Sequence, residues 1–321
     1  MIALRTNRHF LCTLGWEKCE LISTRRRQQT PTHPDMRRVT AIVSGGGSGL
    51  GLAAARRIVQ QGGRVLISDV NTAGHDAAKE LGPAAAFAHA DCTSEADIAA
   101  ALDLAEQTFG HPVSAAINTA GTAYPAKTVS RKGQPHPLDA FENVLHVNAV
   151  GSFNVARLAA ARMMSREPDA DTGERGVIVH TASIAAFDGQ AGQAAYAASK
   201  GALVGMTLPM ARDLAPLGIR VCTIAPGIFD TPMSTLQPNR VPCSRVPLLP
   251  RVPSHCSRRP VLCVRPVAKV SDDVRTSLFK AIPFPSRFGR PDEYAAYVET
   301  ILLNPYLNGE VTRLDGAVRM G

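Results

Sequence analysis

The sequence predicts an α/β fold: a single Rossmann-type, doubly wound parallel sheet with helices on both faces. Short apolar runs typical of strands alternate with longer helix-like segments from residue 39 to residue 314. The first apolar run leads directly into a glycine-rich turn and then a helical segment. Strand, glycine turn and helix in this order are typical of dinucleotide-binding folds, and repeated alternation favours a parallel sheet covered on both faces.

The first unit contains the glycine turn. Residues 39–43 are predicted as a buried strand and residues 52–61 as a helix, with Ser44-Gly-Gly-Gly-Ser-Gly-Leu-Gly51 between them. Glycines permit a tight turn and a close approach of the backbone to a pyrophosphate, which the helix N-terminus then attracts. We therefore predict that the cofactor phosphates are held by Ser44, Gly45, Ser48, Gly49, Leu50 and Gly51.

The second strand, residues 64–69, ends in Asp69. A carboxylate at this place accepts hydrogen bonds from the adenosine ribose and repels a 2′-phosphate, which selects NAD over NADP. The alternative is that Asp69 caps the next helix, since Asn71 and Thr72 follow it.

Two further units follow. A strand over residues 84–90 precedes a helix over 95–109, and the strand over 114–118 runs into Asn118-Thr-Ala-Gly121. Because an α/β sheet binds ligands outside the carboxyl ends of its strands, we expect cofactor contacts from Asp91, Cys92, Asn118, Ala120 and Gly121.

A single long helix is predicted over residues 138–164, and it contains Asn148. A polar side chain inside an apolar helix needs a hydrogen-bond partner. Asn148 is therefore either a structural hydrogen-bonding residue or a member of a proton relay.

The next segment carries the candidate chemistry. An apolar strand over residues 176–182 delivers Ser183, and the Ala-rich helix that follows carries Tyr196 and Lys200, four residues apart on one helical face. A nearby ammonium lowers a phenol pKa that starts near ~10, which suits proton transfer. The Ser183 hydroxyl is placed to hold a substrate oxygen beside that phenol.

The remaining elements complete the predicted sheet. The helix continues to about residue 216 with Pro209 inside it, and a strand over 219–224 leads to the candidate cofactor residues Pro226, Gly227 and Thr231. A helix over 291–303 and a strand over 310–314 follow.

Positive charge and cysteine are concentrated in two segments of the chain. The net charge is +8, but residues 1–36 carry +3 and residues 237–270 carry +7, which leaves −2 elsewhere. Five of the seven cysteines lie in those two segments and no Cys-x-x-Cys occurs, so we expect no metal site, no disulfide scaffold and a reducing compartment. No run of eighteen apolar residues exists to span a membrane.

The two basic segments have no clear period. Residues 1–35 are predicted as a disordered N-terminal extension, with an Arg-rich transit peptide as the alternative, and residues 36–321 as the NAD-binding domain. That domain is interrupted at residues 237–270 by an irregular insert rich in Pro, Arg and Cys. A structureless loop of this length is rare in a compact domain, so we interpret it as retained noncoding sequence, with a genuine substrate lid as the alternative.

Taken together, these residues resemble the short-chain dehydrogenase/reductase family. The resemblance rests on Ser44-Gly45-x3-Gly49-x-Gly51, Asp69, Asn118-Thr-Ala-Gly121, Asn148, Ser183, Tyr196-x3-Lys200 and Pro226-Gly227. Ser44 replaces the usual Thr and Thr119 a residue that is often Asn. Segments such as residues 182–196 and 308–316 further resemble family members that act on 3-hydroxyacyl-CoA.

The resemblance implies an oxidoreductase of fatty acid metabolism that transfers a hydride between NAD(H) and the 3-hydroxy or 3-oxo group of an acyl-CoA, or a hydroxysteroid. Tyr196 would be the general acid/base, Ser183 would orient the substrate oxygen, and Lys200 would lower the tyrosine pKa and hold the nicotinamide ribose. Asn148 would maintain a water relay, and Gln190 would contact substrate. A homotetramer in the mitochondrial matrix is implied, with the cytoplasm as the alternative.

A noncatalytic protein, or an RNA-processing partner, built on the same fold is the competing interpretation. A noncatalytic protein would be expected to lose Ser183, Tyr196 or Lys200, and all three are present. The basic segments carry no recognition motif and suggest at most nonspecific attraction to phosphate, so we expect no nucleic-acid partner.

Overall fold

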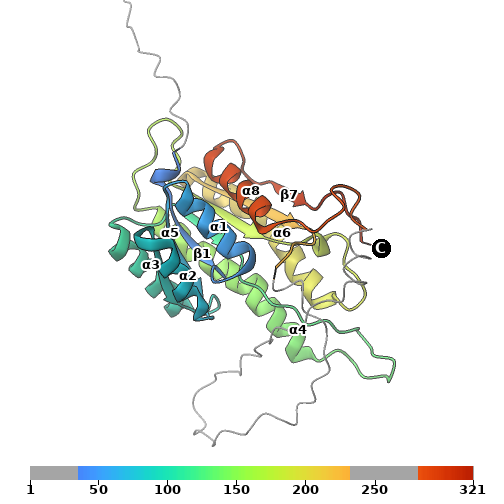
Figure 1. Cartoon of the computed structure of the whole chain (residues 1–321). Helices are drawn as coiled ribbons and strands as arrows, with labels where there is room; N and C mark the ends of the chain where they lie inside the picture. Colours follow the sequence, from blue (N-terminus) through green and yellow to red (C-terminus); the bar gives the residue numbers. More distant parts are fainter. Residues whose placement is uncertain (1–34, 232–280, 321) are drawn as a thin grey trace, which may run out of the picture. The chain divides into compact units, whose positions relative to one another are not determined.

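The computed structural model describes residues 35–231 and 281–320 (Figure 1). This part of the chain forms a seven-stranded sheet in the order β3-β2-β1-β4-β5-β6-β7, and every neighbouring pair is parallel. The predicted fold class is confirmed. The strands are β1 (Thr40–Ser44), β2 (Arg64–Asp69), β3 (Ala85–His89), β4 (Ala115–Asn118), β5 (Gly176–Thr181), β6 (Ile219–Pro226) and β7 (Val311–Leu314).

The order of the strands reverses between β1 and β4. The chain builds outward from β1 to β3 and then crosses back to place β4 on the other side of β1. Ligands of such sheets bind outside the carboxyl ends of the strands at this reversal. The glycine turn after β1 and the segment after β4 both lie there.

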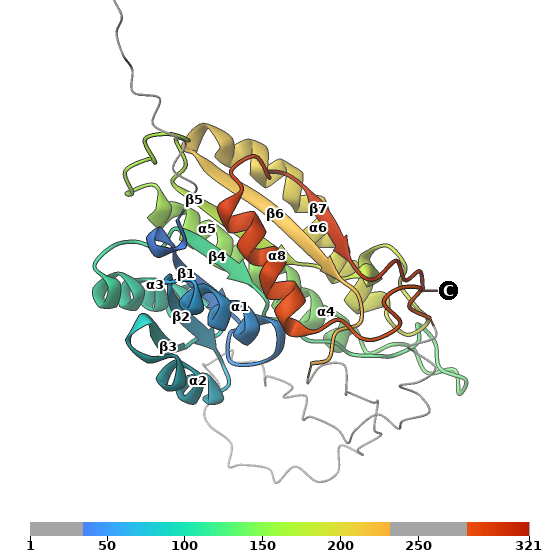
Figure 2. The ribbon, with the colours of Figure 1, turned by 45° about the horizontal axis from the view of Figure 1, so that its top comes forward.

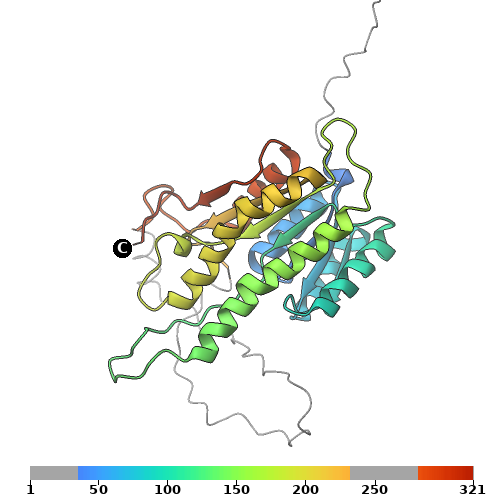
Figure 3. The same ribbon diagram turned by 180° about the vertical axis from the view of Figure 1, so that it is seen from behind.

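Helices cover both faces of the sheet. They are α1 (Gly49–Gln60), α2 (Ala73–Leu81), α3 (Glu95–Phe109), α4 (Leu138–Leu145), α5 (Ser152–Met163), α6 (Ala194–Leu214) and α8 (Pro291–Leu303). Apolar side chains of α1, α2 and α8 pack in one core cluster and those of α3, α5 and α6 in another. Figure 2 shows α1 and α8 over the first face, and Figure 3 shows α5 and α6 from behind.

Strand β5 shows how the sheet separates these two cores. Val177 and Val179 belong to the cluster under α1 and α8, whereas Ile178 belongs to the cluster under α5 and α6. Side chains alternate between the faces of a strand, and all six residues of β5 are buried. The strand that delivers Ser183 is therefore fixed by packing from both faces.

The prediction of a single helix over residues 138–164 is wrong in detail. A six-residue π-helical segment, His146–Gly151, separates α4 from α5. Gly151 lies against Cys92, because a Cβ on this glycine would stand 2.6 Å from the Cys92 Sγ. The wider π turn places Asn148 at a fully buried position, which is consistent with the frequent occurrence of such turns at functional sites.

Several sequence predictions lie outside the described residues. The insert at 237–270 and nearly all of the extension at 1–35 fall there; Asp35 is described, and its Oδ1 accepts a hydrogen bond from the Arg37 amide at 3.0 Å. No helix in the described ranges is long and apolar enough to cross a bilayer. Those same ranges contain no group of three His, Cys, Asp or Glu side chains able to hold a metal ion.

Candidate active site

The glycine turn packs tightly against the end of β4. Gly45 has φ +73°, and a Cβ there would stand 2.5 Å from the Ala120 amide nitrogen. A Cβ on Gly51 would collide with the Gly45 carbonyl oxygen. Ser48 is the N-cap residue of α1, but its side chain makes no capping hydrogen bond. Amide groups in the first turn of a helix lack partners within the helix, so this turn presents donors suited to a phosphate.

Asp69 is tied to this turn. Its Oδ2 accepts a hydrogen bond from the Gly47 amide at 2.9 Å, and its Oδ1 accepts one from the Asn71 amide at 2.9 Å. The residue that precedes α2 as its N-cap is Thr72. Asp69 therefore does not cap that helix, and its half-buried carboxylate lies at the carboxyl end of β2 beside the glycine turn.

Asp91 and Cys92 form the turn after β3. Asp91 Oδ1 accepts hydrogen bonds from the amide and the hydroxyl of Thr93 at 2.9 and 2.8 Å. The Cys92 thiol is buried beside the Val147 carbonyl at 3.8 Å, and burial raises its pKa to about 12. The Cys92 side chain thus packs against the π-helical segment, and this residue offers only its backbone to a cofactor.

Asn118 also directs its side chain inward. Its Nδ2 donates to the Ser152 carbonyl at 3.2 Å and lies 3.1 Å from His180 Nδ1. Burial lowers the pKa of His180 to about 4, with the charge of Lys200 as a second cause. The amide of Asn118 therefore joins β4 to α5 and to a neutral imidazole on β5.

The structure brings Ser183, Tyr196 and Lys200 together at the carboxyl end of β5. Lys200 Nζ donates a hydrogen bond to the Thr181 carbonyl at 2.7 Å and lies 5.7 Å from the centroid of the Tyr196 ring. The Ser183 side chain lies close enough to the Tyr196 phenol to lower its pKa in part. Ser183 Oγ also accepts a hydrogen bond from the Ala185 amide at 3.1 Å, which fixes the hydroxyl at the start of η4 (Ile184–Ala186).

The electrostatics differ from the sequence prediction. Burial lowers the pKa of Lys200 from 10.5 to about 8. Burial raises the pKa of Tyr196 above 10.0, and the Ser183 side chain opposes this only in part. The net shift of the Tyr196 pKa is therefore upward, because desolvation of the phenol outweighs the contribution of Ser183 while the ammonium is directed at the Thr181 carbonyl. The lowering of the tyrosine pKa by Lys200 stays a prediction.

Asn148 connects the loop after β4 to α6. Its Oδ1 accepts from the Thr122 amide at 2.7 Å, and its Nδ2 donates to the Thr122 carbonyl and to Ser199 Oγ, both at 2.9 Å. Ser199 Oγ in turn donates to the Tyr196 carbonyl at 2.7 Å. Of the two interpretations offered by the sequence, the structural hydrogen-bonding role is confirmed, and the water relay stays a prediction.

The other predicted residues lie at and after the end of β6 and in the loop before α6. The Gly227 amide, directly after Pro226, donates to the Leu314 carbonyl at 2.9 Å. Thr231 is the last described residue before the gap at 232–280. Gln190 is exposed, and its backbone amide donates to Gln193 Oε1 at 3.0 Å. None of the described hydrogen bonds joins its side chain to Ser183, Tyr196 or Lys200.

Two residues of this centre were not predicted. Thr181, which anchors Lys200, also places its Oγ1 at 2.7 Å from the Tyr294 hydroxyl, and both groups are buried. Tyr294 lies on α8, 113 residues away in the sequence. Neither residue stands in a motif, so a three-dimensional arrangement was needed to find them.

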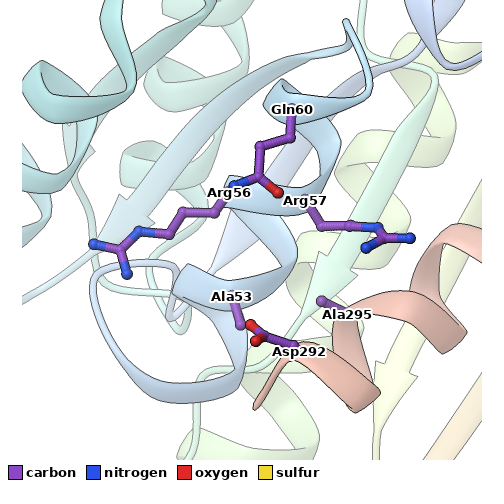
Figure 4. Close-up of a pocket in the computed structure, with 6 residues that line it drawn as sticks. All are labelled: Ala53, Arg56, Arg57, Gln60, Asp292 and Ala295. Carbon is purple, nitrogen blue, oxygen red and sulfur yellow. The ribbon is translucent and has the colours of Figure 1, made fainter. Parts of the chain in front are cut away.

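A pocket of about 190 Å³ lies elsewhere, between α1 and α8 (Figure 4). Its two arginines are paired with acids, Arg56 with Glu80 at 3.0 Å and Arg57 with Glu299 at 2.5 Å. The pocket contains none of the predicted site residues. It is lined by Ala53, Arg56, Arg57, Gln60, Asp292 and Ala295.

Comparison with known proteins agrees with this geometry. Residues 39–240 match the family described as short chain dehydrogenase. The chain belongs to the short-chain dehydrogenase family. Members of this family are oxidoreductases, so the chain is an enzyme of that class.

Individual short-chain dehydrogenases show how far the similarity extends. The chain is 50% identical over 284 residues to the 3-hydroxyacyl-CoA dehydrogenase type-2 of Bos taurus, covering 88% of this chain and 95% of that protein. The crystal structure of 3-hydroxyacyl-CoA dehydrogenase type-2 from Mycobacterium avium has a TM-score of 0.74 and 37% identity, with 88% and 96% of the two chains covered. A 3-ketoacyl-(acyl-carrier-protein) reductase from Brucella melitensis complexed with NADH has a TM-score of 0.69 and 26% identity, with 87% and 98% covered.

Proposed function

We propose that this chain catalyses the reversible, NAD-linked oxidation of the 3-hydroxyl group of an acyl-CoA, with a hydroxysteroid as a further substrate. The observation that carries the proposal is the convergence of Ser183, Tyr196 and Lys200 at one strand end. The names of the relatives, 3-hydroxyacyl-CoA dehydrogenase type-2, support the choice of substrate.

The residues at the β1 and β2 ends fit a nicotinamide dinucleotide. The cradle at Gly45 and Gly51 has no room for a Cβ, and the start of α1 supplies amide donors for a pyrophosphate. Asp69 presents a carboxylate beside the turn, which favours a ribose diol and disfavours a 2′-phosphate. The NADH complex of the Brucella melitensis reductase adds support for NAD over NADP. The cofactor contacts we assign are Ser44, Gly45, Ser48, Gly49, Leu50, Gly51, Asp69, Asp91, Cys92, Asn118, Ala120, Gly121, Tyr196, Lys200, Pro226, Gly227 and Thr231.

The cofactor supplies the hydride acceptor, and the protein manages one proton. Ser183 holds the substrate oxygen through its hydroxyl, and Tyr196 exchanges the proton with that oxygen. Lys200 holds the nicotinamide ribose and keeps a positive charge near the phenol, while Asn148 maintains the water relay to solvent. Gln190 lines the approach of the substrate.

The direction of the reaction depends on the proton of Tyr196. Burial raises the pKa of this phenol, so it retains its proton at neutral pH and acts as an acid toward a 3-oxo group. Oxidation of the alcohol needs the phenolate as a base. We therefore expect the reduction to be favoured at neutral pH and the oxidation to accelerate as pH rises.

The assembly and cellular location belong to the same proposal. The resemblance to 3-hydroxyacyl-CoA dehydrogenase type-2 supports a homotetramer that acts in the mitochondrial matrix, with the cytoplasm as the alternative. The substrate is a small molecule, and a role as an RNA-processing partner has no support in the described residues.

The test is the consumption of NADH with a short 3-oxoacyl-CoA, followed by absorbance. The full chain and a variant lacking residues 237–270 should both bind NADH, and Tyr196→Phe should lower turnover by ~10²–10⁴-fold. If NADH binds and neither chain reduces the thioester, the proposed substrate class is wrong.

A further inference from the structure

The last peptide of β5 is contacted from both faces of the sheet. Thr181 follows Val177 and Val179 in the two-residue alternation, so its side chain lies on the α1 and α8 face, where its Oγ1 meets the Tyr294 hydroxyl at 2.7 Å. Its carbonyl accepts the ammonium of Lys200 from α6, which packs on the opposite face. One residue thus joins a helix on one face to the candidate catalytic lysine on the other.

The geometry of the sheet explains why this carbonyl is available. The amide of Ala182, in the same peptide plane as the Thr181 carbonyl, donates to the Ile224 carbonyl of β6 at 2.7 Å. The carbonyl must therefore point away from β6, toward β4. However, β4 ends at Asn118, whose partner on β5 is His180. The Thr181 carbonyl lies one residue beyond the last position at which β5 pairs with β4. It therefore has no partner on β4, and it accepts the hydrogen bond from Lys200 instead.

Tyr294 is unusually well placed to hold this peptide. Its side chain is fully buried, and its ring packs edge-on against Phe229 with 6.5 Å between centroids. Two buried hydroxyls that bond to each other cannot exchange this partner for water without exposing the core. The hydroxyl of Tyr294 consequently fixes the rotamer of Thr181, which is already restricted by its β-branch.

We propose that Tyr294 is a positioning residue for Lys200: it holds Thr181 from the far face of the sheet and so fixes the carbonyl that orients the ammonium. The inference rests on the proposed function, in which Lys200 holds the nicotinamide ribose and supports proton transfer by Tyr196. Tyr294 itself contacts neither substrate nor cofactor in this scheme. Its effect reaches the chemistry only through Thr181.

The same helix supplies a matched control. Tyr297 also bonds through its hydroxyl to a threonine hydroxyl on a strand, Thr312 Oγ1 of β7, at 2.8 Å. Thr312 has no contact with Lys200 among the described hydrogen bonds. Tyr294→Phe and Tyr297→Phe therefore delete the same kind of hydrogen bond from one helix, and only the first lies on the path to the lysine.

The experiment compares these two variants by NADH affinity and thermal unfolding in the full chain. It also compares kcat and KM for a short 3-oxoacyl-CoA in the full chain and in the chain lacking residues 237–270. Tyr294→Phe should weaken NADH binding and lower kcat by roughly tenfold or more, as expected for a misplaced catalytic group, with little change in KM for the thioester. Tyr297→Phe should change neither the NADH affinity nor kcat by more than about twofold. Equal behaviour of the two variants would overturn the proposal.

A second comparison separates positioning from stability. Removing one partner leaves a buried hydroxyl unpaired, whereas removing both is nearly neutral for stability. The double variant Thr181→Val with Tyr294→Phe should therefore unfold near the parent temperature while NADH affinity and kcat stay low. If NADH affinity and kcat of the double variant recover together with its stability, the hydrogen bond only supports folding and the positioning role is refuted.

The outcome is distinguishable from failure of the proposed function. NADH affinity does not depend on the identity of the substrate, so it reports on Lys200 even if the thioester is not turned over. If NADH binds and neither the full chain nor the chain lacking residues 237–270 reduces the thioester, the substrate assignment is contradicted. Unchanged NADH affinity in Tyr294→Phe contradicts only the inference about Tyr294.

Discussion

Replacing Lys200 with Met should change the pH dependence of stability in a defined direction. Lys200 is 5% exposed, and burial lowers its pKa from 10.5 to about 8. At ~1.4 kcal/mol for each pH unit, this difference means that holding the ammonium in the fold costs roughly 3 kcal/mol. Below pH 8 the lysine is charged in both folded and unfolded chains, so the whole cost is present.

The cost disappears as pH rises. Between about pH 8 and pH 10.5 the folded lysine has lost its proton while the unfolded one keeps it, and stability rises wherever the unfolded state binds more protons. Lys200→Met has no such titration. The stability of the variant minus that of the parent should therefore fall by roughly 3 kcal/mol across this interval.

A second, pH-independent difference in the free energy of unfolding between parent and variant comes from the hydrogen bond to the Thr181 carbonyl. A neutral amine still donates that bond, and the Met variant lacks it at every pH, at a cost of ~1 kcal/mol. The variant should thus be more stable than the parent by roughly 2 kcal/mol near neutrality and slightly less stable at high pH, while losing activity.

Urea unfolding at a series of pH values measures this difference, and Lys79→Met, an exposed position on α2, is the control. Groups that titrate in both proteins cancel in the comparison. A constant difference between parent and Lys200→Met from pH ~7 to pH ~10.5 would refute the reasoning about burial.

Three further predictions concern the cofactor, the proton and the insert. Asp69→Ala should raise turnover with NADP relative to NAD by about tenfold or more, since a like-charge contact with a 2′-phosphate is removed; equal use of the two cofactors by the parent contradicts this role. Tyr196→Phe should lower kcat by ~10²–10⁴-fold, the usual contribution of general acid–base catalysis, yet still bind NADH in a fluorescence titration. The chain as written should bind NAD but turn over acyl-CoA poorly, and deletion of residues 237–270 should restore activity in the same assay, whereas inactivation by the deletion without unfolding would identify a genuine lid.

The parts of the site that the sequence predicted are those encoded by local spacing. Tyr196 and Lys200 are one helical turn apart, and the glycine turn lies directly between a strand and a helix, so periodicity and residue type were sufficient. The family resemblance then assigned roles to these residues. Such local patterns can be read from the sequence because they do not depend on how the remaining elements pack.

The parts that were missed depend on contacts between distant segments. The pairing of Thr181 with Tyr294 requires α8 to lie on the same face as alternate residues of β5, which no local pattern encodes. The π-helical segment was predicted as ordinary helix, and the contact of its Gly151 with Cys92 likewise joins residues that are far apart in the sequence. The upward shift of the Tyr196 pKa by burial was not predicted, because the sequence shows the spacing of the lysine and does not show the surroundings of the phenol.

The strand order also affects how the chain folds as it is synthesised. β6 ends at Pro226, but α8, which covers the same apolar face as Val177 and Val179, begins only at Pro291. Until α8 and β7 emerge, that face lacks α8, one of the helices that cover it, and the outer edge of β6 lacks its neighbouring strand. Uncovered apolar surface and unpaired strand edges promote aggregation. Strand β5, which leads to Ser183, is thus fully enclosed only after α8 has been synthesised, and the chain is exposed to misassembly during that delay.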